Sequence, residues 1–447
     1  MSLPGYPKYK YSGSPWLGDV PAAWGVQPLL GVATERSESN VGMLESNLLS
    51  LSYGRIIQKD IDSNDGLLPA SFETYQIVRP GDIVLRLTDL QNDKRSLRSA
   101  IVKEQGIITS AYLALWPHKI EPGFLAYLLR AYDLTKVFYS MGGGLRQSMK
   151  FSDLKRMPVV LPSDDEQSAI AAFLDRETAK IDAMIGEQEK LIALLAEKRQ
   201  ATISHAVTRG LKPDAPMKDS GVTWLGDVPA YWRVIPLKHF ARIGNGSTPN
   251  RDNSDYWAED GFPWLNSSVV NQDEVSNAQQ FVTAKALDEC HLPIVTPPAV
   301  LVGITGQGKT RGMATRLCLT ATVNQHLAYI KPDERELSVP YLVRVFEAAY
   351  DHLRTESEGA GSTKGAITCD QLGRLCIAAP SIEEQGEIIE FLSHEISKLD
   401  GLVSAAESAI DLLKERRSAL ISAAVTGKVD VRVVVADVSN ATEELAA

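Results

Sequence analysis

A duplicated sequence pattern constrains the fold of this chain more than any other feature. The six residues Trp-Leu-Gly-Asp-Val-Pro at 16–21 return unchanged at 224–229. A second pattern, in which Pro-Ser is followed by two residues and then Glu-Gln, occupies 162–167 and returns at 380–385. Two copies of one unit in one chain predict an internal pseudo-dimer with two-fold symmetry. Such an arrangement suits a target that consists of two half-sites.

A long run of helix-forming residues follows each copy of the second pattern. Ser163 and Ser381 are predicted helix caps, with Glu166 and Glu384 completing capping boxes. Apolar residues then recur at alternating steps of four and three, the spacing of a coiled-coil seam. This seam comprises Leu174, Ile181, Ile185, Ile192 and Leu195 in the first helix, and Leu392, Ile396, Leu399, Val403, Ile410 and Leu413 in the second. The alternative is a pair of ordinary amphipathic core helices.

Two-fold symmetry requires the paired helices to run antiparallel. We therefore expect an α+β fold: two globular α/β domains separated by two long helices that pair as an antiparallel coiled coil. The expected boundaries are 1–160 for the first globular domain, 161–211 for the first helical region, 212–378 for the second globular domain, 379–428 for the second helical region, and 429–447 for a tail.

The globular segments carry matching strand and helix signals. Strand-like runs at 82–85 and 107–115 have counterparts at 299–302 and 317–330, and a helix at 124–132 matches one at 341–350. Similarity between the halves is strong at the ends of each unit and poor in the middle. This pattern indicates a duplicated scaffold whose reading surfaces have diverged.

The charge distribution limits the partners of the chain. The net charge is −10, but residues 1–160 hold 18 cations against 15 carboxylates, whereas residues 381–447 hold 6 against 13. The acidity lies mainly in the helical regions and tail, which favours protein contacts there. Alone, the chain should bind DNA weakly and non-specifically, because it offers few surplus cations to displace counterions.

The composition also excludes several classes of protein. No apolar run is long enough to cross a bilayer, and the first residues do not resemble a signal peptide, so we expect no membrane association and a cytoplasmic location. The four cysteines form no CxxC pair, and the histidines have no metal-ligand spacing. We therefore expect no metal site.

The segment Gly303–Thr310 matches the phosphate-binding pattern GxxxxGK[ST]. A functional loop of this kind needs a strand before it and a helix after it. The residues that follow look like another strand, so we interpret the segment as a glycine-rich hairpin. The sequence contains no other catalytic motif. We expect a non-enzymatic protein without a cofactor, with a nucleotide-binding enzyme as the weaker alternative.

Further motifs complete a resemblance to a known family. The second half contains Gly244-Asn245-Gly246-Ser247-Thr248-Pro249, then Phe262-Pro263-Trp264-Leu265, then Asn324-Gln325-His326. Together with the two duplicated patterns, these motifs resemble the specificity subunit of type I restriction–modification systems. The resemblance covers nearly the whole chain. The first half lacks the Gly-x-Gly-x-Thr-Pro loop and the Asn-Gln pair, which indicates a recognition domain of another subtype.

This resemblance implies DNA recognition without catalysis, with the globular domains at 1–160 and 212–378 as target recognition domains. Each recognition domain would read one half of a split, asymmetric site on double-stranded DNA, and the helices would fix the spacing. Two methyltransferase subunits would bind the helical region, and motor-nuclease subunits would join to restrict unmodified DNA. The remaining alternative is a coiled-coil scaffold or adaptor that joins proteins without reading DNA.

Base and phosphate contacts are expected from polar side chains on loops. The candidates in the first domain are Arg86, Lys94, Arg95, Arg98, Arg146, Gln147 and Lys150. The candidates in the second domain are Ser247, Thr248, Asn250, Arg251, Asn266, Gln307, Lys309, Arg311, Thr363 and Lys364. Four tryptophans in and beside the first repeated pattern are predicted to be buried packing anchors, namely Trp16, Trp24, Trp224 and Trp232.

Overall fold

A computed structural model describes residues 4–61, 69, 71–88, 97–141, 148–306, 308–358 and 365–432. The chain divides into two compact units. The first unit comprises residues 1–188 and 407–447, and the second comprises 189–406. Each unit therefore combines one globular domain with one half of each long helix.

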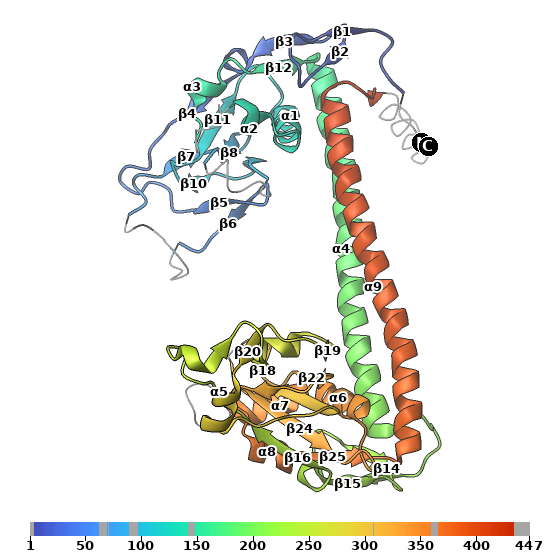
Figure 1. Ribbon diagram of the computed structural model, residues 1–447. Helices are drawn as coiled ribbons and strands as arrows, with labels where there is room; N and C mark the ends of the chain where they lie inside the picture. The colour runs from blue at the N-terminus through green and yellow to red at the C-terminus, as the bar shows by residue number, and fades with distance from the viewer. Residues whose placement is uncertain are drawn as a thin grey trace. The chain divides into compact units, whose positions relative to one another are not determined.

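The two long helices are α4 (Asp164–Arg209) and α9 (Ile382–Val425), drawn in green and red in Figure 1. In the first unit the start of α4 and the end of α9 share a hydrophobic core, which includes Leu174 and Ile421. In the second unit the end of α4 and the start of α9 share another, which includes Ile203 and Ile388. The pairing is thus antiparallel in each unit, as the repeat predicts.

The predicted seam follows the protected side of both helices. Its buried members are Leu174, Ile181, Leu195, Leu392, Ile396, Leu399 and Ile410. Its half-buried members are Ile185, Ile192, Val403 and Leu413. A stripe of this kind lets two helices pack along their length while the remaining side chains stay in water.

The first unit is built on a four-stranded antiparallel sheet with the strand order β4-β11-β8-β9. These strands are β4 (Ala33–Arg36), β8 (Ile83–Leu85), β9 (Ser99–Ile101) and β11 (Leu113–Pro117). Smaller sheets pair β1 (Tyr9–Tyr11) with β2 (Asp19–Pro21), β3 (Gly25–Pro28) with β12 (Pro158–Leu161), β5 (Leu49–Ser52) with β6 (Arg55–Gln58), and β7 (Gln76–Val78) with β10 (Gly106–Ile108). Its short helices are η1 (Leu29–Gly31), α1 (Pro122–Leu134), α2 (Val137–Met141) and α3 (Phe151–Leu154).

The second unit repeats this plan and extends it. Its main sheet has the order β16-β24-β21-β22-β19, from β16 (Ala241–Asn245), β19 (Glu274–Val275), β21 (Ala299–Gly303), β22 (Ala314–Leu317) and β24 (Leu327–Pro332). A second sheet joins β17 (Trp257–Ala258), β18 (Phe262–Leu265), β20 (Gln280–Val282) and β23 (Thr322–Val323). Two further pairs join β13 (Met217–Asp219) to β14 (Asp227–Pro229) and β15 (Arg233–Pro236) to β25 (Cys376–Ala379). The helices are η2 (Leu237–His239), η3 (Ser254–Tyr256), η4 (Ser267–Asn271), α5 (Ala284–Glu289), α6 (Val339–Ala348), α7 (Tyr350–Glu358) and α8 (Cys369–Arg374).

The strand order shows where the duplication is preserved. The orders β4-β11-β8-β9 and β16-β24-β21-β22 correspond strand for strand, and the β3–β12 pair corresponds to the β15–β25 pair. Between β4 and β8 the first unit places the β5–β6 hairpin and β7. Between β16 and β21 the second unit instead places β19 and three strands of its second sheet. The divergence expected from the sequence thus lies in these inserted segments.

One buried glutamine joins each globular domain to its long helix. Gln167 Oε1 accepts a hydrogen bond from Glu121 N, just before α1 (2.8 Å), and its Nε2 donates to Pro162 O (2.9 Å). Gln385 repeats both bonds, at 2.8 and 3.1 Å, with the corresponding backbone groups before α6 and α9. The repeated Glu-Gln pattern therefore reflects a buried amide that satisfies backbone groups where two elements meet.

The glutamates of the same pattern do not complete the predicted capping boxes in the described part of the chain, so that prediction was wrong. The serine of the second copy does accept from the backbone N–H of Glu384 (3.3 Å). The Glu384 carboxylate, however, accepts from Tyr231 Oη (2.7 Å) and Trp232 Nε1 (3.1 Å). In the first unit Glu166 accepts from Tyr6 Oη (2.6 Å). Each carboxylate therefore binds an aromatic side chain from the segment around the first repeated pattern.

Two of the four predicted tryptophan anchors are confirmed. Trp24 and Trp232 are each only 1% exposed. Each packs against the glycine that follows a long helix, Trp24 against Gly427 and Trp232 against Gly210. Both glycines have a positive φ (71°), the conformation that ends a helix and that glycine adopts without strain.

The other two tryptophans differ from the prediction. Trp224 is half-buried and stacks on His352, with 6.0 Å between the ring centroids. Trp16 is exposed, so the prediction of a buried anchor was wrong there. Within the repeated six-residue pattern the leucine and the valine are buried in both copies, namely Leu17, Val20, Leu225 and Val228. The pattern thus serves packing through these two residues and through the tryptophan that follows it.

Candidate nucleic-acid interface

Three loops of the second unit meet around a chain of polar side chains. The Thr248 hydroxyl donates to Gln325 Oε1 (2.6 Å), and Gln325 Nε2 lies 3.2 Å from His326 Nε2. On the other side of the imidazole, His326 Nδ1 lies 2.8 Å from Thr305 Oγ1. A neutral histidine that accepts at Nε2 carries its proton on Nδ1, so one tautomer satisfies both contacts. We call Thr248, Gln325, His326 and Thr305 the polar chain.

Backbone contacts hold the polar chain in place. Gly246 N donates to Asn324 O (3.3 Å), and Ile304 N donates to His326 O (3.0 Å). A Cβ added at Gly246 would lie 1.8 Å from the carbonyl oxygen of Val323, so only glycine fits there. The second glycine of the Gly-x-Gly-x-Thr-Pro motif therefore allows two loops to touch.

Arg251 is a further polar residue of the same loop, three residues after Thr248. Its guanidinium lies 4.0 Å from the ring centroid of Trp257 and 4.9 Å from that of Trp264. Its Nη2 donates to Gln280 Oε1 (3.1 Å). Two aromatic rings and one amide thus orient an exposed cation. Such a cation can reach a phosphate without a large loss of conformational entropy.

The other candidates of this loop region mainly form turns. The side-chain oxygens of Asn250 and Asn266 accept from backbone N–H groups two residues further along the chain, at 3.0 and 2.9 Å. Ser247 is half-buried, and its carbonyl accepts from Trp264 Nε1 (3.1 Å). These residues shape the surface around the polar chain. Asn250 is also exposed and can face a ligand.

The segment Gly303–Thr310 is a hairpin, as the sequence indicates. Strands β21 and β22 on either side of it are antiparallel neighbours. The backbone N–H of Gly312 returns to Gly303 O (2.7 Å). Because a strand follows the segment, it lacks the helix N-terminus that a phosphate-binding loop requires.

Two of the predicted DNA contacts, Arg98 and Arg311, are buried cations. Arg311 is buried and pairs with Glu358 (2.7 Å). Arg98 is fully buried, and its guanidinium donates to Thr88 O (2.7 Å) and Tyr139 Oη (2.9 Å). Each guanidinium holds a neighbouring chain segment in place through a carboxylate, a carbonyl or a hydroxyl group, which compensates for the loss of water around the charge.

The remaining candidates divide by whether the structure describes them. Lys150 and Lys309 are exposed, and Arg86 is half-buried. Exposed lysines of this kind remain available for phosphate contacts. The candidates that lie outside the described residues are Lys94, Arg95, Arg146, Gln147, Gln307, Thr363 and Lys364.

Four polar residues of this interface are absent from the sequence-based candidates, one of which is Thr305 of the polar chain. Gln325, His326 and Gln280 all contact residues of the polar chain or Arg251. The Asn-Gln-His motif was the available signal for the first two. Gln280 carries no local signal, because it reaches Arg251 from a strand that lies 29 residues further along the chain.

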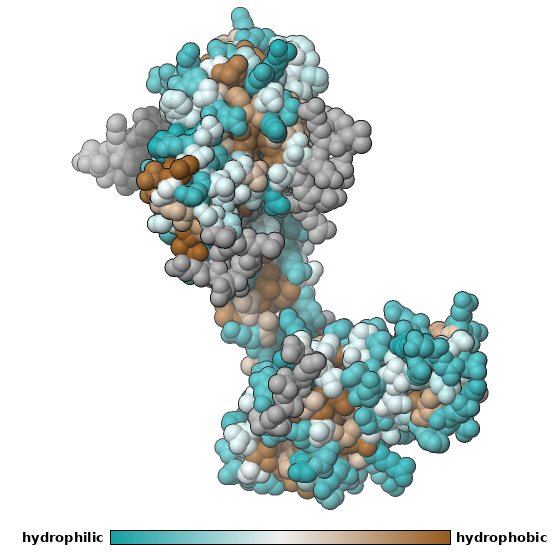
Figure 2. Space-filling view, turned by 90° about the vertical axis from the view of Figure 1, so that its left-hand side faces the viewer, coloured by the Kyte–Doolittle hydropathy of each residue, from teal (hydrophilic) through white to brown (hydrophobic). Residues whose placement is uncertain are grey.

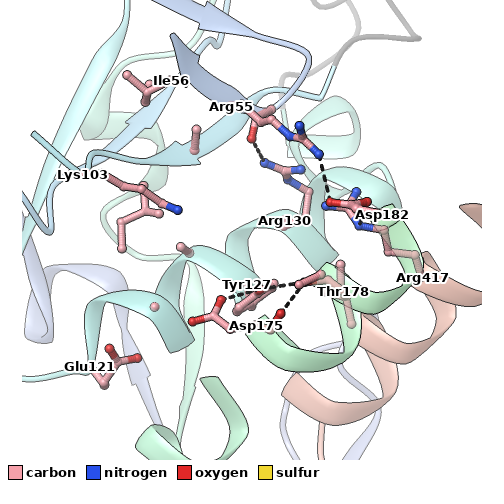
Figure 3. A pocket seen from close by; sticks show the side chains of 17 residues that line it. Arg55, Ile56, Lys103, Glu121, Tyr127, Arg130, Asp175, Thr178, Asp182 and Arg417 are labelled. Carbon is pink, nitrogen blue, oxygen red and sulfur yellow. Dashed lines mark hydrogen bonds and ion pairs between the residues drawn. The ribbon is translucent and has the colours of Figure 1, made fainter. Parts of the chain in front are cut away.

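The first unit has a cleft between its globular domain and its half of the helix pair. The cleft has a volume of about 780 Å³ (Figure 3). Asp182 on α4 lies between two cations there, Arg55 (2.9 Å) and Arg417 (3.3 Å). Burial lowers the pKa of Arg130 to about 10, and this side chain donates to Gly54 O (2.7 Å). These contacts connect the β5–β6 hairpin, α1 and both long helices.

The second unit has a larger cleft, of about 1040 Å³. Arg199 on α4 lies between Asp400 on α9 (2.9 Å) and Glu347 on α6 (3.6 Å). Exposed Lys309 also lines this cleft, whereas exposed Arg316 is ion-paired with Glu274 of the same lining. The face of this unit turned to the viewer in Figure 2 is mainly hydrophilic, with small hydrophobic patches. A polar surface of this kind suits a hydrated partner.

Metal-binding and membrane-spanning features are absent from the described ranges. These ranges contain no group of three or more His, Cys, Asp or Glu side chains that could hold a metal ion. No helix within them is both long and apolar enough to cross a membrane.

Comparisons with known proteins find a family model for part of the chain and one relative that matches most of it. Residues 229–402 match the family model of the type I restriction modification DNA specificity domain. The putative type I restriction enzyme MjaX specificity subunit of Methanocaldococcus jannaschii is 22% identical over 436 residues, which cover 93% of this chain and 96% of that one. The MjaIX specificity subunit of the same organism is 26% identical over 43% of each chain.

Solved structures agree on the fold. A chain from a structure of complex assembly and conformational transition of the type I R-M system superposes with a TM-score of 0.63, at 18% identity, over 91% of this chain and 98% of that one. The HsdS subunit from Thermoanaerobacter tengcongensis gives a TM-score of 0.52, at 17% identity, over the same shares of the two chains.

Proposed function

We propose that this chain is a specificity subunit of a type I restriction–modification system and that it recognises a DNA sequence composed of two half-sites. Recognition of DNA sequence is the role of the matched domain. The observation that supports two half-sites is the repeated strand order of the two units. Because the inserted segments differ, each domain presents a different surface, and the two half-sites would differ in sequence.

The chain acts as a recognition subunit without catalysis of its own. Chemistry on the DNA would therefore come from partners, since specificity subunits of type I systems assemble with methyltransferase and restriction subunits. A scaffold that never reads DNA does not explain the polar chain or the oriented Arg251. The hairpin at Gly303–Thr310 gives no support to a nucleotide-binding enzyme. The cytoplasmic location stays a prediction from the sequence.

Apolar side chains on the exposed side of the long helices support a partner interface. In the first unit Met184 and Leu412 are 43% and 65% exposed. In the second unit their repeat equivalents Leu402 and Leu194 are 53% and 61% exposed. Exposed apolar residues that recur in both copies indicate that each unit has a surface that a partner protein covers. We infer that two methyltransferase subunits bind there, one on each half of the helix pair.

The helices also suit a role as a spacer. A helix of 46 residues is about 69 Å long at 1.5 Å per residue. Half-sites read from one face of DNA are separated by whole helical turns of roughly 34 Å each. We infer that helix length sets the number of unread base pairs between the half-sites.

A domain exchange tests the proposal. Residues 212–378 would be replaced with the matching segment of a relative that has a different target, and the methylated sequences would be mapped in cells that also contain the methyltransferase subunits. We expect one half of the target to change while the other half and the spacing stay constant. An unchanged target, or a change in both halves, would contradict the proposal.

A further inference from the structure

Gln325 is the most exposed member of the polar chain, and its amide has partners on both sides. We propose that Gln325 reads an adenine in the half-site of the second unit, with Thr248 and His326 as positioning residues. This inference rests on the proposed function and names one base-reading residue within it.

The amide of Gln325 has a fixed orientation. Thr248 donates to Oε1 (2.6 Å), and Nε2 lies 3.2 Å from the ring nitrogen of His326. Thr305 holds the opposite ring nitrogen at 2.8 Å. The loops that carry these residues are joined through the backbone at Gly246 and at Ile304 N. A glutamine held in this way loses little further side-chain entropy when it binds a ligand.

The same amide keeps unused hydrogen-bonding capacity. A glutamine amide has two acceptor lone pairs and two N–H donors. Thr248 occupies one lone pair, and the contact with His326 uses one N–H. One acceptor and one donor therefore remain on an exposed side chain for a ligand.

Adenine matches this remaining pair of groups. In the major groove adenine presents the N7 acceptor beside the N6 donor, which complements one donor and one acceptor of an amide. Guanine presents two acceptors, N7 and O6, and satisfies only the donor. Cytosine and thymine each offer a single polar group. Adenine is therefore the base for which both remaining groups of Gln325 find a partner.

The neighbouring cation fits the same site. Arg251 is exposed and is oriented by Trp257, Trp264 and Gln280. It can contact the DNA backbone while Gln325 reads the base edge. Phosphate contacts of this type fix the register of a recognition loop on the duplex.

The experiment uses the full-length chain in complex with its methyltransferase subunits. The methylated motif of the wild-type complex is mapped first. Binding is then measured for duplexes in which each base pair of that motif is replaced in turn. The variants are Gln325→Ala, Gln325→Glu and Thr248→Val, with Gln272→Ala as the control because Gln272 is another exposed glutamine of the same unit.

In Gln325→Ala we expect the preference for A·T over other base pairs to fall by roughly 5- to 150-fold at one position of one half-site. This is the range for the loss of one bidentate base contact. Gln325→Glu, which keeps the side-chain size, presents acceptors alone and should shift preference at that pair toward cytosine, whose N4 is a donor. Thr248→Val should weaken discrimination at the same pair by a smaller factor. Gln272→Ala should match the wild type.

Unchanged discrimination in Gln325→Ala and Gln325→Glu would overturn the inference, as would a loss at a pair that is not A·T. The domain exchange distinguishes this failure from a failure of the proposed function. If the exchange changes one half-site but the Gln325 variants behave as wild type, the inference alone is wrong. If the wild-type complex has no sequence preference, both are wrong.

Discussion

Arg199 on α4 forms an ion pair with Asp400 on α9, with Nη1 and Oδ1 2.9 Å apart. The first unit contains the equivalent pair with the helices exchanged, Arg417 on α9 and Asp182 on α4, at 3.3 Å. The partners correspond at the 218-residue offset of the Glu-Gln pattern. Partly exposed pairs contribute at most about 1 kcal/mol each. The repeated pair therefore matters less for stability than for fixing one helix register in both copies.

A carboxylate placed in the seam should destabilise the protein more where the substituted position is more buried. Leu195→Asp would place a carboxylate at a buried position, and we expect the free energy of unfolding to fall by roughly 3–5 kcal/mol. Leu413→Asp should cost less, because Leu413 is half-buried. Urea denaturation followed by circular dichroism measures both. Equal, small effects at the two positions would contradict the coiled-coil seam.

The close approach at Gly246 predicts a local defect in recognition. Gly246→Ala would force the loop at 245–250 away from Val323, because the new Cβ would meet a backbone oxygen. We expect weaker discrimination in one half-site and a lower melting temperature. Gly308→Ala is the matched control, since a Cβ there meets nothing within 4 Å. If both variants behave alike in binding and melting, the backbone contact does not matter.

The oriented arginine predicts a phosphate contact. Arg251→Ala should weaken binding to specific and non-specific duplexes by similar factors and reduce the salt-dependence slope by about 1. Fluorescence anisotropy at several salt concentrations gives both quantities. The contrasting variant is Arg98→Ala, which removes a buried guanidinium and should lower stability instead. A base-dependent effect of Arg251→Ala would assign this residue to sequence readout.

The contact between the first and last described segments should weaken in acid. Hydrogen bonding to Arg432 lowers the pKa of Asp430 below its usual value, and Asp430 N donates to Pro4 O (2.7 Å). A carboxylate with a depressed folded pKa stabilises the fold above its unfolded pKa of about 4, and this stabilisation is lost as pH falls through the folded pKa. Amide exchange at Asp430 and Val431 should accelerate in that range. Asp430→Asn should remove this pH dependence, and an unchanged profile in that variant would rule out the carboxylate as its cause.

Much of the architecture could be predicted from the sequence because it depends on local periodicity and repetition. The seam follows from the spacing of apolar residues, and the antiparallel pairing follows from the symmetry of the repeat. The hairpin at Gly303–Thr310 follows from the strand-like residues that come after it. The roles of Glu166 and Glu384 do not, since their partners Tyr6 and Tyr231 lie 160 and 153 residues away. A capping box is a local interaction, and here a distant hydroxyl competes successfully for the carboxylate.

The reading residues are harder to predict for a different reason. A cation flanked by loop residues looks solvent-exposed, yet Arg98 and Arg311 are buried and bind neighbouring chain segments. Nothing in the local sequence separates them from Arg251. The Asn-Gln-His motif marks Gln325, but only the contact with Thr248 shows that its amide is held in one orientation.

The division of residues between the two units has a consequence for biosynthesis. The second unit is one continuous stretch, 189–406, whereas the first needs residues from both of its separate segments. Val431 belongs to the same core as Tyr6 and Trp24. On the ribosome, the globular domain of the first unit must therefore wait for α9 to emerge before its core can close. We expect the first unit to complete its folding after the second, and nascent chains should expose its globular domain to chaperones for longer.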